Sequence, residues 1–162
     1  MKKGTWILIL ALFVLPVCLR VYAAGGTFDA VKSLAGEWKG KATDGKEVRL
    51  TYSLISGGTA VMERMQAGQE EMITTYYPDG NSVMMTHYCM ANNQPRMRAG
   101  NTADAKRIVF SYVDATNLSA PDAGHMKQLV LTVQDKDHIT EEWTWDEKGQ
   151  QKVEIFQMTR VQ

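Results

Sequence analysis

The sequence has few cysteines and no pair that could staple its fold. Cys18 lies in an apolar N-terminal run, and Cys89 stands alone in the rest of the chain. No intrachain disulfide is therefore expected. The commonest state of such a residue is a buried free thiol that packs as a small hydrophobe. A metal ligand and an intermolecular link remain open as alternatives for a lone cysteine in an exported protein.

The sequence also lacks an excess of either charge, because it holds 18 basic and 18 acidic residues. Nothing in this balance draws the chain to nucleic acid or to anionic lipid. The apolar run from Thr5 to Val17 is well short of the about 20 residues that cross a bilayer. Catalytic signatures are missing as well: there is no Gly-x-Ser-x-Gly elbow, phosphate loop or paired metal motif. We therefore expect no catalysis.

The N-terminal run is typical of a secretory signal peptide. It opens with the basic segment Met1-Lys2-Lys3-Gly4 and ends with Val21-Tyr22-Ala23, which suits a signal peptidase. We expect cleavage after residue 23, which leaves a single domain, 24–162, in the periplasm or outside the cell. Removal of three basic residues leaves 15 basic and 18 acidic ones, a net charge of −3. Lipidation at Cys18 is the alternative, although a valine precedes that cysteine.

Alternation of apolar and polar residues predicts about ten strands after one short helix. The helix is expected over Thr27 to Leu34, with Thr27 as its N-cap and Asp29 in its first turn. The predicted strands are Glu37–Ala42, Val48–Ile55, Thr59–Gln66, Met72–Tyr77, Ser82–Met90, Pro95–Ala99, Arg107–Val113, Met126–Gln134, Ile139–Trp145 and Val153–Val161. Short turns such as Asp79-Gly80-Asn81 join them, and no βαβ rhythm is present. The pattern predicts an all-β fold, an antiparallel up-and-down β-barrel, because closure removes exposed strand edges.

The segment Leu34-Ala35-Gly36-Glu37-Trp38-Lys39-Gly40 resembles the Gly-x-Trp opening motif of the lipocalin and calycin barrels. Its Leu-x-Gly-x-Trp-x-Gly form is similar to the nitrobindin-like, haem-binding-like barrels. The segment Thr86-His87-Tyr88-Cys89, with Asn93-Gln94-Pro95-Arg96-Met97 after it, is similar to uncharacterised bacterial lipocalin-like proteins. The resemblance implies a barrel whose tryptophan packs across its floor. Nitrobindin-like proteins hold haem through a histidine near the chain end; His125 and His138 are the candidates here, but neither context matches, so no cofactor is expected.

Period-two alternation also predicts which side chains face the barrel interior. The expected inward residues are Val48, Leu50, Tyr52, Leu54, Val61, Glu63, Met65, Val83, Met85, His87, Cys89, Ile108, Phe110, Tyr112, Leu129, Leu131, Val133, Ile139, Glu141, Trp143 and Trp145. An inward Glu63, His87 or Glu141 would be a buried polar group, which needs a hydrogen-bond partner or a ligand.

These residues predict a pocket for a small apolar or amphipathic molecule, because such pockets are apolar with a few polar groups. The predicted ligand-binding residues are His87, Glu63, Arg96, Trp143, Tyr52 and Met85. Arg96 or Arg98 would clamp a ligand carboxylate. The alternative is that His87 satisfies a hydrogen bond of the core and the arginines face water.

A second hypothesis is a periplasmic soft-metal protein. Met85, His87 and Cys89 lie at alternate positions of one predicted strand, and thioether, imidazole and thiolate together suit Cu(I). Their spacing of about 7 Å along a strand is wide for one ion. The same spacing works against Cys89 and His87 as a nucleophile and its base. The oligomeric state and the identity of the ligand stay open.

Overall fold

The structure is a computed structural model, and it describes residues 25–100 and 106–162. The predicted signal peptide, residues 1–23, lies outside these ranges. The described chain consists of a helix, ten strands and one 3₁₀ turn: α1 (Gly25–Lys32), β1 (Gly36–Lys41), β2 (Glu47–Ile55), η1 (Ser56–Gly58), β3 (Ala60–Ala67), β4 (Glu70–Asp79), β5 (Ser82–Tyr88), β6 (Gln94–Ala99), β7 (Arg107–Thr116), β8 (His125–Val133), β9 (His138–Glu147) and β10 (Gln150–Arg160). Within the described ranges, no helix has the length and apolar character of a membrane span.

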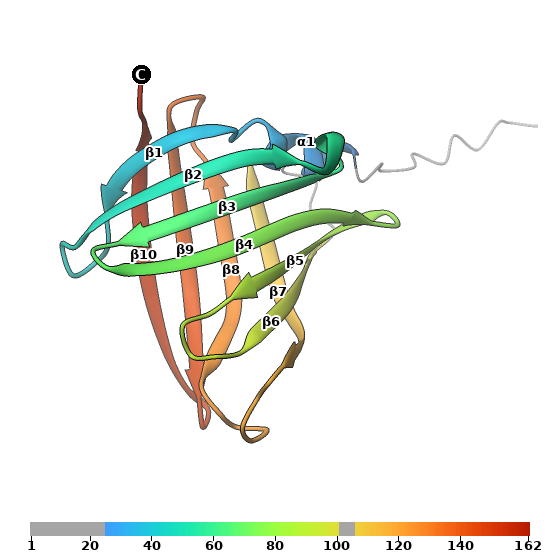
Figure 1. Cartoon of the computed structure of the whole chain (residues 1–162), viewed down its shortest axis with the longest axis vertical. Coiled ribbons are helices and arrows are strands. Elements are labelled where there is room, and N and C mark those ends of the chain that lie inside the picture. Colours follow the sequence, from blue (N-terminus) through green and yellow to red (C-terminus); the bar gives the residue numbers. More distant parts are fainter. Residues whose placement is uncertain (1–24, 101–105) are drawn as a thin grey trace, which may run out of the picture.

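The ten strands close into one antiparallel barrel (Figure 1). Each strand pairs with its neighbours along the chain, and β1 pairs with β10 from Trp38 opposite Arg160 to Lys41 opposite Gln157. Closure satisfies the backbone hydrogen-bonding groups that an open sheet would leave at its edges. The fold class predicted from the sequence is confirmed.

Both glycines of the Leu-x-Gly-x-Trp-x-Gly motif have a structural reason. Gly36 has a φ of +131°, a conformation that L side chains rarely adopt, and a Cβ there would lie 2.8 Å from Nη1 of Arg160. A Cβ on Gly40 would lie 1.9 Å from the carbonyl oxygen of Gln157 on β10. The motif therefore lets β1 lie close against β10 where the barrel closes.

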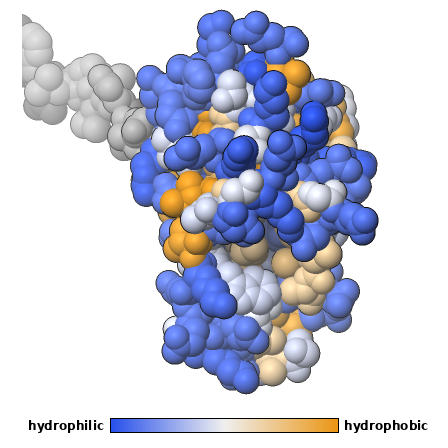
Figure 2. Space-filling view, turned by 90° about the vertical axis from the view of Figure 1, so that its left-hand side faces the viewer, coloured by the Kyte–Doolittle hydropathy of each residue, from blue (hydrophilic) through white to orange (hydrophobic). Residues whose placement is uncertain are grey.

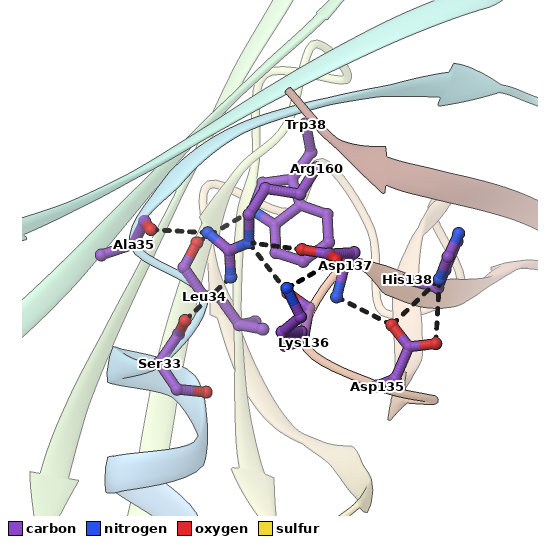
Figure 3. A network of polar contacts seen from close by, with 9 residues as sticks. All are labelled: Ser33, Leu34, Ala35, Trp38, Asp135, Lys136, Asp137, His138 and Arg160. Atoms are coloured by element: carbon purple, nitrogen blue, oxygen red, sulfur yellow. Dashed lines mark hydrogen bonds and ion pairs between the residues drawn. The ribbon is translucent and has the colours of Figure 1, made fainter. Parts of the chain in front are cut away.

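Trp38, between these glycines, is buried at the end of the barrel (Figure 3). Its indole Nε1 donates a hydrogen bond of 2.9 Å to the carbonyl of Leu34. The Arg160 guanidinium lies 4.1 Å from the ring centre, which is cation–π distance. The same guanidinium donates hydrogen bonds of 2.8–3.0 Å to the carbonyls of Ser33, Ala35 and Lys136. One arginine of β10 thus joins the turn between α1 and β1, Trp38 of β1 and the β8–β9 turn.

Helix α1 covers this end of the barrel, and Phe28, Val31 and Leu34 from the helix and the turn after it belong to the core. The helix begins at Gly25, two residues before the predicted start. The predicted N-cap at Thr27 is therefore wrong, because Thr27 lies inside the first turn. Packing of the apolar face outweighs the poor helix propensity of the leading glycines.

The predicted inward residues mostly line the interior, but Leu54 does not. Val48, Leu50 and Tyr52 are buried, whereas Leu54 is 51% exposed. Strand β1 begins opposite Tyr52, so Leu54 has no β1 residue beside it. Tyr112, Val133 and Trp145 are also only partly buried. Figure 2 shows one outer face, which is mostly hydrophilic with smaller apolar groups.

Candidate functional site

A row of polar side chains crosses the interior wall of the barrel. Tyr52 on β2 pairs with Glu63 on β3, Glu63 pairs with Thr74 on β4, and Thr74 pairs with His87 on β5. All four residues are at most 2% exposed. Three further buried residues contact this row, and together we call the seven the polar layer: Tyr52, Glu63, Thr74, Tyr76, His87, Glu141 and Trp143.

Glu141 is held from both of its oxygens. Its Oε1 accepts a hydrogen bond from the hydroxyl of Tyr52 on β2, a residue far from Glu141 in the sequence. Its Oε2 accepts a hydrogen bond of 2.9 Å from Nε1 of Trp143, two residues along β9. Burial raises the pKa of Glu141, and these two donors oppose the rise. Glu141 therefore has partners within the protein for both oxygens.

Glu63 is held from one oxygen only. Its Oε2 accepts a hydrogen bond of 2.6 Å from the Tyr76 hydroxyl, whereas its Oε1 is buried and has no partner among the described residues. Burial, and secondly the nearby Glu141, hold the pKa of Glu63 well above its ordinary value. Burial also raises the pKa values of Tyr52 and Tyr76, so both hydroxyls stay protonated donors.

His87 has the same one-sided arrangement. Its Nδ1 lies 3.0 Å from the Thr74 hydroxyl, and its ring packs against Trp143 with 4.7 Å between the ring centres. Burial lowers the pKa of His87 to about 4, so the imidazole is neutral near neutral pH. The second nitrogen, Nε2, is buried without a partner among the described residues.

An unpartnered buried polar atom costs about 1–3 kcal/mol, and folded proteins contain few of them. Glu63 Oε1 and His87 Nε2 come from strands separated only by β4, with Thr74 between them. Their backbones are thus about 10 Å apart, at roughly 4.8 Å per strand. The polar layer therefore offers two open hydrogen-bonding positions on one interior wall, next to an aromatic side chain.

Five of the six residues predicted to bind a ligand lie in the interior: His87, Glu63, Trp143, Tyr52 and Met85. The sixth, Arg96, is on the outside, so its prediction as a pocket residue is wrong. Its Nε donates a hydrogen bond of 2.6 Å to Asp114, and Arg98 pairs with Asp79. The two arginines are two residues apart on β6 and share its outer face.

Three members of the polar layer, Thr74, Tyr76 and Glu141, are missing from the predicted ligand-binding residues. Glu141 was expected to face inward, but no face was predicted for Thr74 and Tyr76. Both lie on β4, where Met72-Ile73-Thr74-Thr75-Tyr76-Tyr77 shows no clean alternation and gives no sign of which face is inward. The only available signal is register. Once Glu63 is placed inward, its β4 partner Thr74 is inward too, and Tyr76 follows two residues later.

The geometry gives no support to a soft-metal site. Met85 and His87 lie inside on β5, but the strand ends at Tyr88, and Cys89 is in the following turn and only partly buried. Burial raises the pKa of the Cys89 thiol, which disfavours the thiolate that binds metals. Across residues 25–100 and 106–162, no three His, Cys, Asp or Glu side chains gather as metal ligands.

A hollow of about 630 Å³ lies at the barrel end opposite α1. Its walls come from the β5–β6 turn, the β7–β8 loop and the β9–β10 hairpin, and they include Asn93, Gly124 and Trp145. The Asn93 amide nitrogen donates a hydrogen bond of 2.9 Å to the Gly124 carbonyl, which ties two of these segments together. We call this end of the barrel the open end, because the hollow lies there among the loops.

Comparison with known proteins identifies the fold and no family. The chain matches no protein-family model and no curated protein. Among solved structures, Rv2717c from M. tuberculosis has a TM-score of 0.61 at 12% identity, covering 84% of this chain and 98% of its own. A protein of unknown function from the DUF3598 family of Nostoc punctiforme has a TM-score of 0.56 at 16% identity, covering 81% of this chain. The match covers 49% of the Nostoc protein, so this chain spans about half its length. The chain has a lipocalin-like barrel fold.

Proposed function

We propose that this chain is an exported protein that binds a small molecule inside its barrel and does not catalyse a reaction. The observation that supports this most directly is the pair of open positions in the polar layer, Glu63 Oε1 and His87 Nε2. A ligand with polar groups that meet these atoms would offset the cost of burying them. The surrounding Met85 and Trp143 supply the apolar wall of an ordinary small-molecule site.

Binding fits the geometry better than catalysis does. The only thiol in the described chain, Cys89, lies in a turn, whereas His87 points inward and contacts Thr74 and Trp143. Cys89 and His87, the thiol and base considered from the sequence, thus form no nucleophile–base hydrogen bond. We propose that the ligand reaches the polar layer through the end opposite α1, because the hollow beside Trp145 lies there.

Native mass spectrometry of the full-length gene product, expressed with its own N-terminal segment and purified without detergent, tests this proposal. We expect a bound organic mass that leaves on denaturation. His87→Ala should reduce its occupancy while the fold survives, and His138→Ala, an exposed histidine, is the matched control. A bare protein mass in the wild type, or full occupancy in a folded His87→Ala variant, would contradict the proposal.

The same spectrum tests export. A mature mass that begins at Ala24 supports the signal peptide, and an acylated mass that begins at Cys18 supports a lipoprotein. An intact N-terminus in cells able to secrete would contradict export.

We also propose, from the Leu-x-Gly-x-Trp-x-Gly motif and the closed barrel, a relation to the nitrobindin-like barrels without their haem. His138 is exposed and hydrogen-bonded to Asp135, and the buried His125 contacts the carbonyl of Ala123 through Nδ1. The absorption spectrum of the purified protein checks this point. Stoichiometric haem absorption that is lost in His125→Ala or His138→Ala would overturn the haem-free assignment.

A further inference from the structure

The charges inside the barrel have one sign. The buried charged and polar residues of the described chain include the acids Glu63, Glu141 and Asp146 but no lysine or arginine. Glu63 and Glu141 lie in the polar layer, while Asp146 is near the open end, where Gln151 and Lys127 contact it. The arginines that were predicted to clamp a carboxylate are outside. Among the described residues, the interior therefore offers an anionic ligand no cationic side chain.

The two carboxyl groups of the layer are close enough for Glu141 to raise the pKa of Glu63, and they differ in their hydrogen-bond partners. Glu141 has two donors, whereas Glu63 accepts a hydrogen bond from Tyr76, lies near the Tyr52 hydroxyl and keeps Oε1 without a hydrogen-bond partner among the described residues. Neither has a cationic partner among the described residues. Burying an ionised carboxylate without a cation is unfavourable, and burying two close together is more so. These costs favour one proton shared between Glu63 and Glu141 when no cation is bound.

Several aromatic side chains belong to the polar layer or pack against it. His87 packs on Trp143, and the rings of Tyr52 and Tyr76 lie 6.4 Å apart, with Phe110 5.5 Å from Tyr76. Aromatic faces attract cations when water is excluded. A buried carboxylate in a layer that also contains aromatic side chains is thus suited to an ammonium or amidinium group on a flat apolar body.

We propose, building on the proposed ligand-binding function, that the interior ligand is a small organic cation, a protonated amine or amidine, which bonds to Glu63 Oε1 and exchanges for a proton on the Glu63–Glu141 pair. The ligand keeps its own N–H protons, and the carboxyl proton passes to solvent. Charge in the barrel is conserved, because one cation replaces one proton. His87 Nε2 binds the second polar group of the ligand, where it has one.

This exchange fixes the sign of the pH dependence. Protons compete with the cation, so affinity rises with pH through the range in which the carboxyl pair ionises, above the ordinary glutamate value of about 4.3. The titratable groups facing Glu63 are Tyr52 from β2, Tyr76 from β4, His87 from β5 and Glu141 from β9. The tyrosines stay protonated and the histidine stays neutral, so the carboxyl pair alone sets the response.

The test compares three probes with similar bodies on the purified barrel: 2-phenylethylamine, 2-phenylethanol and 3-phenylpropanoate. Isothermal titration calorimetry in buffers of different ionisation enthalpy gives affinity and proton release together. We expect the amine to bind at least about tenfold more tightly than the alcohol, as a charge-assisted hydrogen bond implies, and to release close to one proton. The carboxylate should not bind.

Variants assign the effect to one atom. Glu63→Gln keeps the shape of the side chain and should remove both the preference for the amine and the proton release. Glu71→Gln, on an exposed β4 glutamate that pairs with Arg64, should change neither. Binding without proton release, equal binding of amine and alcohol, preference for the carboxylate, or no binding of the amine would overturn the inference. A co-purifying organic mass in the same preparation would then leave the ligand-binding function standing.

Discussion

Glu63 and His87 show how two residues on one wall acquire opposite pKa shifts from one cause. Both are buried, and burial disfavours the charged form of each. For Glu63 the pKa rises, so the folded state holds its proton. For His87 the pKa falls, so the imidazole of the folded state stays unprotonated at pH values where an exposed histidine would bind a proton. The empty barrel is consequently most stable in a window where the carboxyl is protonated and the imidazole is neutral.

The rise at Glu63 predicts a loss of stability towards alkaline pH. Because the folded pKa exceeds the unfolded value of about 4.3, the folded protein binds more protons, and stability falls as pH rises through the folded pKa. Above about pH 6.5, where the opposite contribution of His87 has ended, Glu63→Gln has no such proton to lose, so its free energy of unfolding should fall less steeply with rising pH than that of the wild type. Urea denaturation of the ligand-free protein measures this. Glu141, whose pKa burial also raises, contributes to the slope that remains, and Glu71→Gln should keep the full slope.

The fall at His87 predicts a loss towards acid pH. Its unfolded pKa is about 6.5 and its folded pKa about 4, so the unfolded state binds more protons between these values. His87 contributes a decrease in stability of up to about 3 kcal/mol as pH falls through this window, at about 1.4 kcal/mol per pKa unit, and proton binding by Glu63 opposes it. His87→Gln should lack this decrease, and His138→Gln, at an exposed histidine, should retain it. Identical acid profiles for wild type and His87→Gln would show that His87 is not buried.

At the scale of the elements, the end of the barrel depends on contacts between β1, β10 and α1. Arg160 supplies a cation–π contact to Trp38 and hydrogen bonds to three carbonyls. Arg160→Met keeps the apolar stem but loses these contacts, and we expect a loss of about 2–4 kcal/mol in the free energy of unfolding. Arg49→Met, at an exposed arginine of β2, should change it by less than about 0.5 kcal/mol. Equal effects of the two substitutions, measured by thermal or urea unfolding, would refute this role.

The elements were predictable because their signals are local. Alternation and turn residues such as Asp79-Gly80-Asn81 identify strands without knowledge of the fold, and all ten predicted strands are present. The start of α1 was missed because Gly25 and Gly26 have poor helix propensity, and only packing in the folded barrel shows that the helix continues through them. The error at Arg96 was avoidable, because alternation along β6 places the apolar Met97 inward and its neighbour Arg96 outward.

The candidate site was predictable only in part, for a physical reason. Glu63 and His87 follow from parity with Val61 and Val83 on their own strands. The contact between Tyr52 and Glu141 joins residues far apart in the sequence and depends on how the barrel closes. No single strand carries that information. The hydrogen bonds that distinguish Glu141 from Glu63 were therefore accessible only from the structure.

At the scale of the whole molecule, the barrel is a single closed ring of neighbouring pairs with one long-range seam, between β1 and β10. Nine of the ten ladders form between strands adjacent in sequence. The seam also carries the contact between Trp38 and Arg160. The polar layer lies inside this ring, so exclusion of water from it requires β1 to pair with β10.

The seam also imposes an order in time. A ribosome makes β1 first and β10 last, so the outer edge of β1 has no partner until nearly the whole chain has been synthesised. During that interval the unpaired edge and Trp38 are exposed to other chains, a period in which β-rich intermediates aggregate. A chain that lacks β10 cannot close the barrel. The pairing of β10 with β1 is therefore the step that removes this exposed edge.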